Sequence, residues 1–160
     1  MNRIVIISSL ILVASALNLA PILPKVPDDF QNRIVGGSEV YIWEYPHQIS
    51  MQLRGRHRCG GSIYRPNVIV SAAHCVVGLN STEGLTIVAG SSQLSQKGQE
   101  LDVYKIIVHE NYKTLNNDYD VAILFLKGSF KFGSNIKPIA LAKNLPETDT
   151  WVTVTGMWNK

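Results

Sequence analysis

Two cysteines, sixteen residues apart, constrain this chain more than any other feature. Cys59 precedes a Gly-Gly pair, and Cys75 directly follows His74 in the stretch 70–75, which reads Val-Ser-Ala-Ala-His-Cys. No other cysteine occurs in the 160 residues, so any intrachain disulfide must join these two. Such a bond would fasten the histidine segment to the Gly-Gly segment, and closing a loop of about 15 residues is worth roughly 3 kcal/mol.

Residues 1–16 have the pattern of a secretory signal peptide. A positively charged start leads into an apolar run over residues 4–14 that is too short to span a bilayer. Residues 14–16, Ala-Ser-Ala, form a small-x-small cleavage site, so we expect cleavage after Ala16, with Ala20 as the second choice. Export would make the protein extracellular, without membrane attachment once the signal is removed, and an oxidising compartment favours the disulfide.

Residues 17–33 differ in composition from the rest of the chain. Three prolines exclude a regular helix or a central strand, and polar residues accompany them. The pattern predicts an extended, exposed propeptide that ends at Arg33. Ile34 then begins an Ile-Val-Gly-Gly motif, which by itself indicates a strand start followed by a glycine turn.

The charge of the chain does not indicate a nucleic-acid partner. The formal net charge is only +3, and the basic residues do not form one stripe. Arg54, Arg56 and Arg58 do cluster around a glycine. The simplest interpretation is a solvated loop tip, with a basic docking patch as the alternative.

The sequence pattern beyond Ile34 predicts an all-β fold. Short strand-like runs alternate with turn residues, and no long helical period occurs. The expected strands cover residues 48–54, 62–64, 68–71, 85–89, 101–108, 121–126 and 151–155. Only residues 72–77 favour a single helical turn, around His74. This pattern is typical of a barrel or a sandwich.

The motifs around Cys59, His74 and Ile34 together resemble those of trypsin-like, chymotrypsin-fold secreted serine proteases. The resemblance covers about residues 33–156. It implies the N-terminal Greek-key six-stranded barrel of a two-barrel fold, plus one strand of a second barrel that is largely missing. Residues 34–156 would then be a partial peptidase domain, and residues 157–160 a divergent tail.

The resemblance also assigns catalytic roles and an activation site. His74 lies where the family has its general base. Asp120, just before the apolar run 121–126, corresponds to the aspartate that orients the histidine. The family's zymogens are cut immediately before Ile-Val-Gly-Gly, which implies an activating protease that cleaves between Arg33 and Ile34. The complete protein would hydrolyse peptide bonds in polypeptide substrates.

Other residues of the same types compete for these roles. Asp118 lies two positions before Asp120, and we expect it to cap the loop instead. His47, His57 and His109 lack a setting comparable to that of His74, so we interpret all three as non-catalytic.

The third member of a triad, a nucleophilic serine in a Gly-Asp-Ser-Gly-Gly context, does not occur in the chain. Ser129 and Ser134 lie in glycine-rich loops without the flanking motif, and Ser62 and Ser71 are structural by resemblance. We therefore expect the chain as given to be an inactive part of a truncated enzyme. Its exposed half-interface would lead it to aggregate, dimerise or recruit another surface. The alternative is a non-enzymatic secreted homologue that acts as a binding or decoy protein.

We expect no cofactor and no metal site. The loop over residues 91–100, which binds calcium in some relatives, offers one carboxylate, Glu100, and Lys97 opposes a cation. Two cysteines and scattered histidines do not make a zinc site. Asn80-Ser81-Thr82 matches an N-glycosylation sequon, with an unmodified turn as the alternative.

Overall fold

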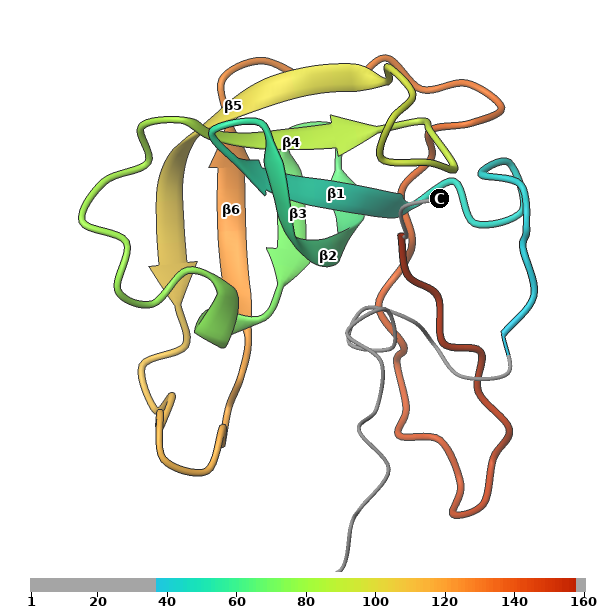
Figure 1. Ribbon diagram of the computed structural model, residues 1–160. Helices are drawn as coiled ribbons and strands as arrows, with labels where there is room; N and C mark the ends of the chain where they lie inside the picture. The colour runs from blue at the N-terminus through green and yellow to red at the C-terminus, as the bar shows by residue number, and fades with distance from the viewer. Residues whose placement is uncertain (1–36, 158–160) are drawn as a thin grey trace, which may run out of the picture. The chain divides into compact units, whose positions relative to one another are not determined.

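A computed structural model describes residues 37–157 (Figure 1). The expected signal peptide, residues 1–16, and propeptide, residues 17–33, lie outside the described residues, as does the Arg33–Ile34 bond. The helical segments of residues 37–157 lack the length and hydrophobicity that spanning a bilayer requires.

Six antiparallel strands close into one barrel, in the order β1-β2-β3-β6-β5-β4, with β4 pairing back onto β1 (Figure 1). A short 3-10 helix, η2, follows β3. The elements are β1 (Gln48–Leu53), β2 (Arg56–Arg65), β3 (Val68–Ser71), η2 (Ala73–Cys75), β4 (Leu85–Ala89), β5 (Gln99–Val108) and β6 (Ala122–Leu126). The barrel confirms the predicted all-β, six-stranded architecture, and η2 confirms the predicted helical turn.

Two of the expected strands need correction. β2 begins at Arg56 instead of residue 62, because Leu53 and Arg56 pair across the turn and continue the ladder with β1. The predicted strand over residues 151–155 is wrong, since this segment carries no strand within the described chain. Alternating side chains do not suffice for a strand, which also needs a neighbouring backbone to pair with.

Inward-facing aliphatic side chains fill the barrel. Ile49 and Met51 on β1 are fully buried, as the alternation predicted. Ser50, on the opposite side of the strand, is also fully buried, and its hydroxyl lies 2.8 Å from His57 Nδ1. The other large side chains that are fully buried in the described chain are those of Ile63, Ile69, Leu85, Ile87, Val103 and Leu124. The core therefore draws on all strands that support the His74 segment, which begins at the end of β3.

The Gly-Gly pair of β2 packs closely against its neighbours. A Cβ at Gly61 would lie 2.8 Å from the carbonyl oxygen of Val70 and 3.0 Å from the side chain of Ile49. A Cβ at Gly60 would lie 3.0 Å from the flexible end of Gln48 and at an ordinary 3.9 Å from the carbonyl oxygen of Ile49. The backbone of β3 cannot move aside as a flexible side chain can. A larger residue should therefore be tolerated less well at Gly61 than at Gly60.

We expect Gly61→Ala to lower the free energy of unfolding by about 1–3 kcal/mol, because it overpacks a rigid contact. Gly60→Ala is the matched control and should cost less. Urea denaturation followed by circular dichroism measures both. Equal losses for the two variants would contradict the close approach of β2 to β3.

Candidate active site

The pairing of β3 with β6 positions the candidate site. These strands are antiparallel, and Ser71 at the end of β3 pairs with Ala122 at the start of β6. His74 lies three residues beyond Ser71, and Asp120 lies two residues before Ala122. The register therefore brings together two residues that are 46 positions apart in the chain.

Asp120 holds His74 through both carboxylate oxygens. The backbone N–H of His74 donates to Oδ1 at 2.7 Å, and the ring Nδ1 lies 2.6 Å from Oδ2. An ionised carboxylate can only accept, so Nδ1 carries a proton, and in the neutral tautomer with this proton Nε2 has the lone pair. This tautomer is the one that a general base acting through Nε2 requires.

The local backbone aims the Asp120 carboxylate at the histidine. Tyr119 has φ +56°, and the N–H of Val121 donates to the carbonyl of Tyr119 at 2.7 Å, which closes a tight turn around Asp120. The Tyr119 ring stacks on His109, with ring centroids 4.8 Å apart. A non-glycine residue at positive φ is uncommon and is retained where the surroundings determine it.

The hydrogen bonds from His74 lower the pKa of Asp120. The ring hydrogen bond contributes most, and the backbone N–H of His74 adds to it, while partial burial of the carboxyl opposes the shift. The carboxylate therefore remains charged over the range in which an imidazole titrates.

The competing aspartate and histidines lie elsewhere. Asp118 contacts its own loop, accepting from the Asn116 side-chain amide at 2.6 Å and from the backbone N–H of Lys113 at 3.1 Å. His109 accepts from the backbone N–H of Asn111 at 3.2 Å. Burial lowers the pKa of both His47 and His57. Of the described residues, only Asp120 forms an ion pair with His74.

The predicted disulfide between Cys59 and Cys75 is present, with Cα atoms 6.3 Å apart. It ties η2 to β2 directly beside His74.

The Cys75 sulfur lies 3.3 Å from His74 Nε2, so Cys59, His74 and Cys75 place three potential ligand atoms within 4.8 Å of one another. Zinc binds cysteine in its deprotonated thiolate form. The two sulfurs here are bonded to each other as a disulfide, so the imidazole of His74 is the one zinc ligand that these three residues provide.

His74 is the more exposed member of the pair. The side chain of His74 is 55% exposed, whereas that of Asp120 is 23% exposed. No serine hydroxyl of residues 37–157 lies within hydrogen-bond distance of Nε2. Ser71 instead donates to the carbonyl of Gly60 at 2.7 Å, which agrees with the structural role expected for it, and Ser129 and Ser134 are exposed in loops.

The interpretation of the arginine cluster as a solvated loop tip did not predict that one of its members, Arg58, contacts the candidate site. Arg58 donates from Nε to the carbonyl oxygen of Cys75, the residue after His74. Nothing in the sequence signals this contact, because it depends on how β2 pairs with β1.

Comparison with known proteins identifies the family of the chain. Residues 34–160 match the family model described as Trypsin. Hypodermin-B of Hypoderma lineatum is 36% identical over 96% of this chain and 58% of its own length. Hypodermin-A of the same species is 43% identical over 78% of this chain and 48% of its own length. Trypsin delta of Drosophila melanogaster is 40% identical over 92% of this chain and 58% of its own length. The chain thus spans about half the length of the curated relatives it matches.

Asp120→Asn should destabilise the fold at neutral pH and weaken the hydrogen bond to His74 Nδ1. The folded-state pKa of Asp120 lies below its ordinary value of 3.8. A lowered pKa stabilises the fold above the unfolded pKa, and this contribution is lost as the pH falls through the folded pKa. The difference in unfolding free energy between wild type and variant should therefore shrink in acid.

Urea denaturation across acid and neutral pH, together with the NMR signal of the Nδ1 proton, measures the effect. Asp118→Asn is the matched control and should leave both readouts unchanged. The assignment of Asp120 fails if the two variants behave alike.

Proposed function

This chain belongs to the trypsin family, and we propose that it is the histidine- and aspartate-bearing part of a secreted serine endopeptidase. The observation that carries the proposal is the 2.6 Å contact between His74 Nδ1 and Asp120 Oδ2, in a histidine whose side chain is 55% exposed. A solvated surface histidine would not need a carboxylate that holds both its ring and its backbone N–H. Both contacts suit a group that must accept a proton in one orientation.

In the proposed reaction, His74 acts as the general base. Its Nε2 accepts the proton from a serine hydroxyl as the oxygen attacks a peptide carbonyl, and it later returns that proton to the leaving amine. Asp120 holds the tautomer and stabilises the imidazolium. The serine and the donors that stabilise the oxyanion belong to polypeptide outside these 160 residues, so the chain alone should not hydrolyse peptides.

Export and activation complete the proposal. Residues 1–16 would direct secretion, which suits the disulfide between Cys59 and Cys75. An activating protease would cleave after Arg33 and free the N-terminus of Ile34.

Asn80 is exposed just after η2, so its sequon is accessible to a glycosyl transferase.

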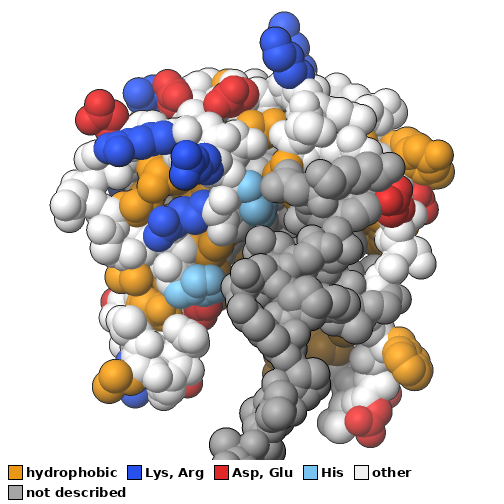
Figure 2. Space-filling model, viewed as in Figure 1, with side chains coloured by type: hydrophobic (Ala, Val, Ile, Leu, Met, Phe, Trp, Pro, Cys, Tyr) orange, Lys and Arg blue, Asp and Glu red, His pale blue; other side chains and the backbone are white. Residues whose placement is uncertain are grey.

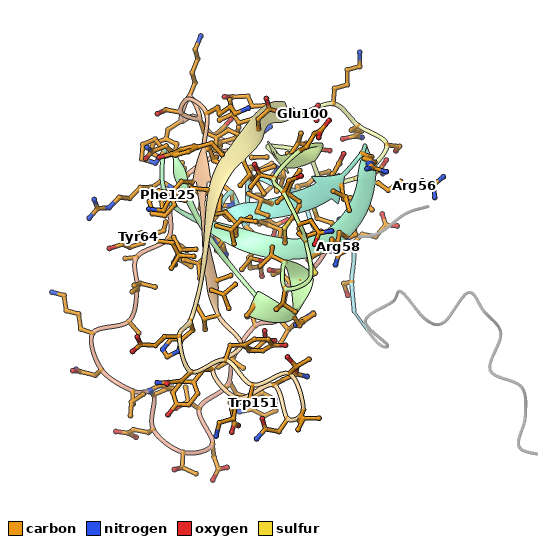
Figure 3. The ribbon with its side chains drawn as sticks, turned by 90° about the vertical axis from the view of Figure 1, so that its left-hand side faces the viewer. Arg56, Arg58, Tyr64, Glu100, Phe125 and Trp151 are labelled. Atoms are coloured by element: carbon orange, nitrogen blue, oxygen red, sulfur yellow. A yellow bond between two sulfur atoms is a disulfide. The ribbon has the colours of Figure 1, made fainter. Side chains whose placement is uncertain are left out.

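The segment after the barrel exposes apolar side chains that would normally be covered. Trp151 is 98% exposed and Val154 is 74% exposed, and Figure 3 shows Trp151 on the segment away from the strands. Polar contacts fasten the segment to the barrel, such as Thr155 Oγ1 to Gln48 Oε1 at 2.8 Å. An exposed apolar patch of this kind marks an interaction surface. We propose that the rest of the protein covers it and that, without that cover, the chain self-associates.

The activity is tested by sequencing the messenger RNA beyond the codon of Gly156 and by expressing any longer product. We expect the continuation to encode Gly-Asp-Ser-Gly-Gly, and the product cleaved after Arg33 to hydrolyse peptide substrates. His74→Ala should lower kcat/KM by about 10⁵- to 10⁶-fold, because the members of a triad act as a unit.

Lys97→Gln is the control for this test, since Lys97 is exposed in the loop over residues 91–100 and contacts neither His74 nor Asp120 within the described chain. It should leave kcat/KM nearly unchanged. A genuine stop codon in an abundant secreted message, with no turnover, would favour the non-enzymatic binding or decoy protein instead.

The self-association is tested by sedimentation velocity on the 160-residue chain. We expect species heavier than a monomer, and Trp151→Ser combined with Val154→Ser should shift the distribution toward monomer. Tyr104→Ser is the matched control, because Tyr104 is 51% exposed on β5. A monomeric wild-type chain would contradict the proposed interface.

A further inference from the structure

Three arginines gather on the hairpin that joins β1 and β2. Arg54, Arg56 and Arg58 fall within five residues, and all three are exposed. Figure 2 shows basic side chains gathered on this face of the molecule, beside a histidine. Figure 3 places Arg56 and Arg58 at the barrel surface, with Arg58 near the short helix that carries His74. We call this cluster the arginine hairpin.

The conformation of the turn between β1 and β2 does not account for an arginine at position 54. Arg54 and Gly55 are the two residues between the paired Leu53 and Arg56, and both have positive φ, +50° and +75°. Two-residue turns of this kind favour asparagine, aspartate or glycine at both central positions. An arginine in the left-handed conformation is disfavoured there, so its side chain contributes something other than the turn.

A β-bulge directs Arg58 toward the active-site segment. The register of β1 and β2 shifts between Met51, which pairs with Cys59, and Gln52, which pairs with His57, so Arg58 has no partner on β1. Bulges of this kind redirect a side chain. The Arg58 Nε–H donates to the carbonyl of Cys75, which leaves the four Nη hydrogens of the guanidinium available for another acceptor.

No carboxylate of the described chain neutralises these three charges. The ion pairs within 4 Å among residues 37–157 join His74 to Asp120 and Lys127 to Asp102. The arginine hairpin is therefore a concentrated positive surface with unused hydrogen-bond donors. Guanidinium groups bind carboxylates through two parallel hydrogen bonds.

The hairpin is joined to the His74 segment through Cys75, by the Arg58 hydrogen bond and by the disulfide to Cys59. Asp120 contacts Nδ1, whereas Nε2 faces the disulfide at Cys75, whose partner Cys59 directly follows Arg58. A polypeptide that presents its reacting bond at Nε2 and continues past the disulfide would therefore pass over the arginine hairpin.

We propose that the arginine hairpin binds the carboxylates of an acidic polypeptide segment that extends across His74. Its use in substrate selection rests on the proposed peptidase function. An acidic polypeptide is favoured over a nucleic acid because three guanidiniums on one hairpin, in a chain of net charge +3, make few phosphate contacts. The proximity to Nε2 is also what a substrate segment requires.

The test measures binding of a fluorescein-labelled peptide rich in Asp and Glu by fluorescence anisotropy. The matched peptide replaces each acid with its amide. We expect tighter binding of the acidic peptide, and Arg54→Gln with Arg56→Gln should weaken it about fivefold or more at physiological salt. Lys97→Gln with Lys131→Gln removes the same charge from exposed loops and should change binding less than about twofold.

Equal binding of the two peptides, or no effect of the double arginine variant, would overturn the proposal. So would competition by heparin or duplex DNA at concentrations far below those of the acidic peptide, since that marks a general polyanion site. Circular dichroism confirms that the variants fold, which exposed side chains should permit.

His74→Ala separates this inference from the proposed function. The variant should still bind the acidic peptide, because the arginine hairpin is intact. If a longer product shows no hydrolysis but the arginine-dependent binding persists, the peptidase proposal fails and the surface stands. If hydrolysis occurs but Arg54→Gln with Arg56→Gln leaves kcat/KM for the acidic peptide unchanged, only the surface fails.

Discussion

The antiparallel pairing of β3 with β6 is the constraint on which the rest of the site depends. Ser71 opposite Ala122 sets where β3 ends and where β6 begins, and the two candidate catalytic side chains follow from those ends. A shift of the register by one residue would turn the inward side chains outward, because side chains alternate along a strand. Burial of Ile69 and Leu124 opposes such a shift, so the hydrophobic core also determines the geometry of the polar pair.

The disulfide and Asp120 restrain the histidine from two sides. Cys75 binds η2 to β2 covalently, while the carboxylate holds the backbone N–H and the ring of His74. An exposed histidine would ordinarily sample several rotamers, and a misplaced base is costly to catalysis. These restraints leave Nε2 as the ring nitrogen that Asp120 does not engage. They also make Cys75 the point where the site meets the arginine hairpin, through the hydrogen bond from Arg58.

Several features of the structure were predictable from residue types and spacing. The strands β3 and β4 begin and end where the apolar runs do, and the Cys59–Cys75 bond followed from the cysteine count. The predicted strand around Trp151 did not form, although its sequence alternates, because no neighbouring backbone pairs with it in the described chain. The early start of β2 was missed for the opposite reason, since pairing with β1 overrides the arginines and glycines that favour a loop.

Residue types and their local order identify the groups that are able to act: an imidazole beside a cysteine, a carboxylate before an apolar strand, and alternating runs that must bury one face. These follow from composition and local period, which any conformation of the chain carries. The folded barrel is what places His74 Nδ1 2.6 Å from Asp120 and brings Arg58 to the carbonyl of Cys75. Those contacts depend on strand register and on a bulge, which arise from hydrogen bonds between segments far apart in the chain.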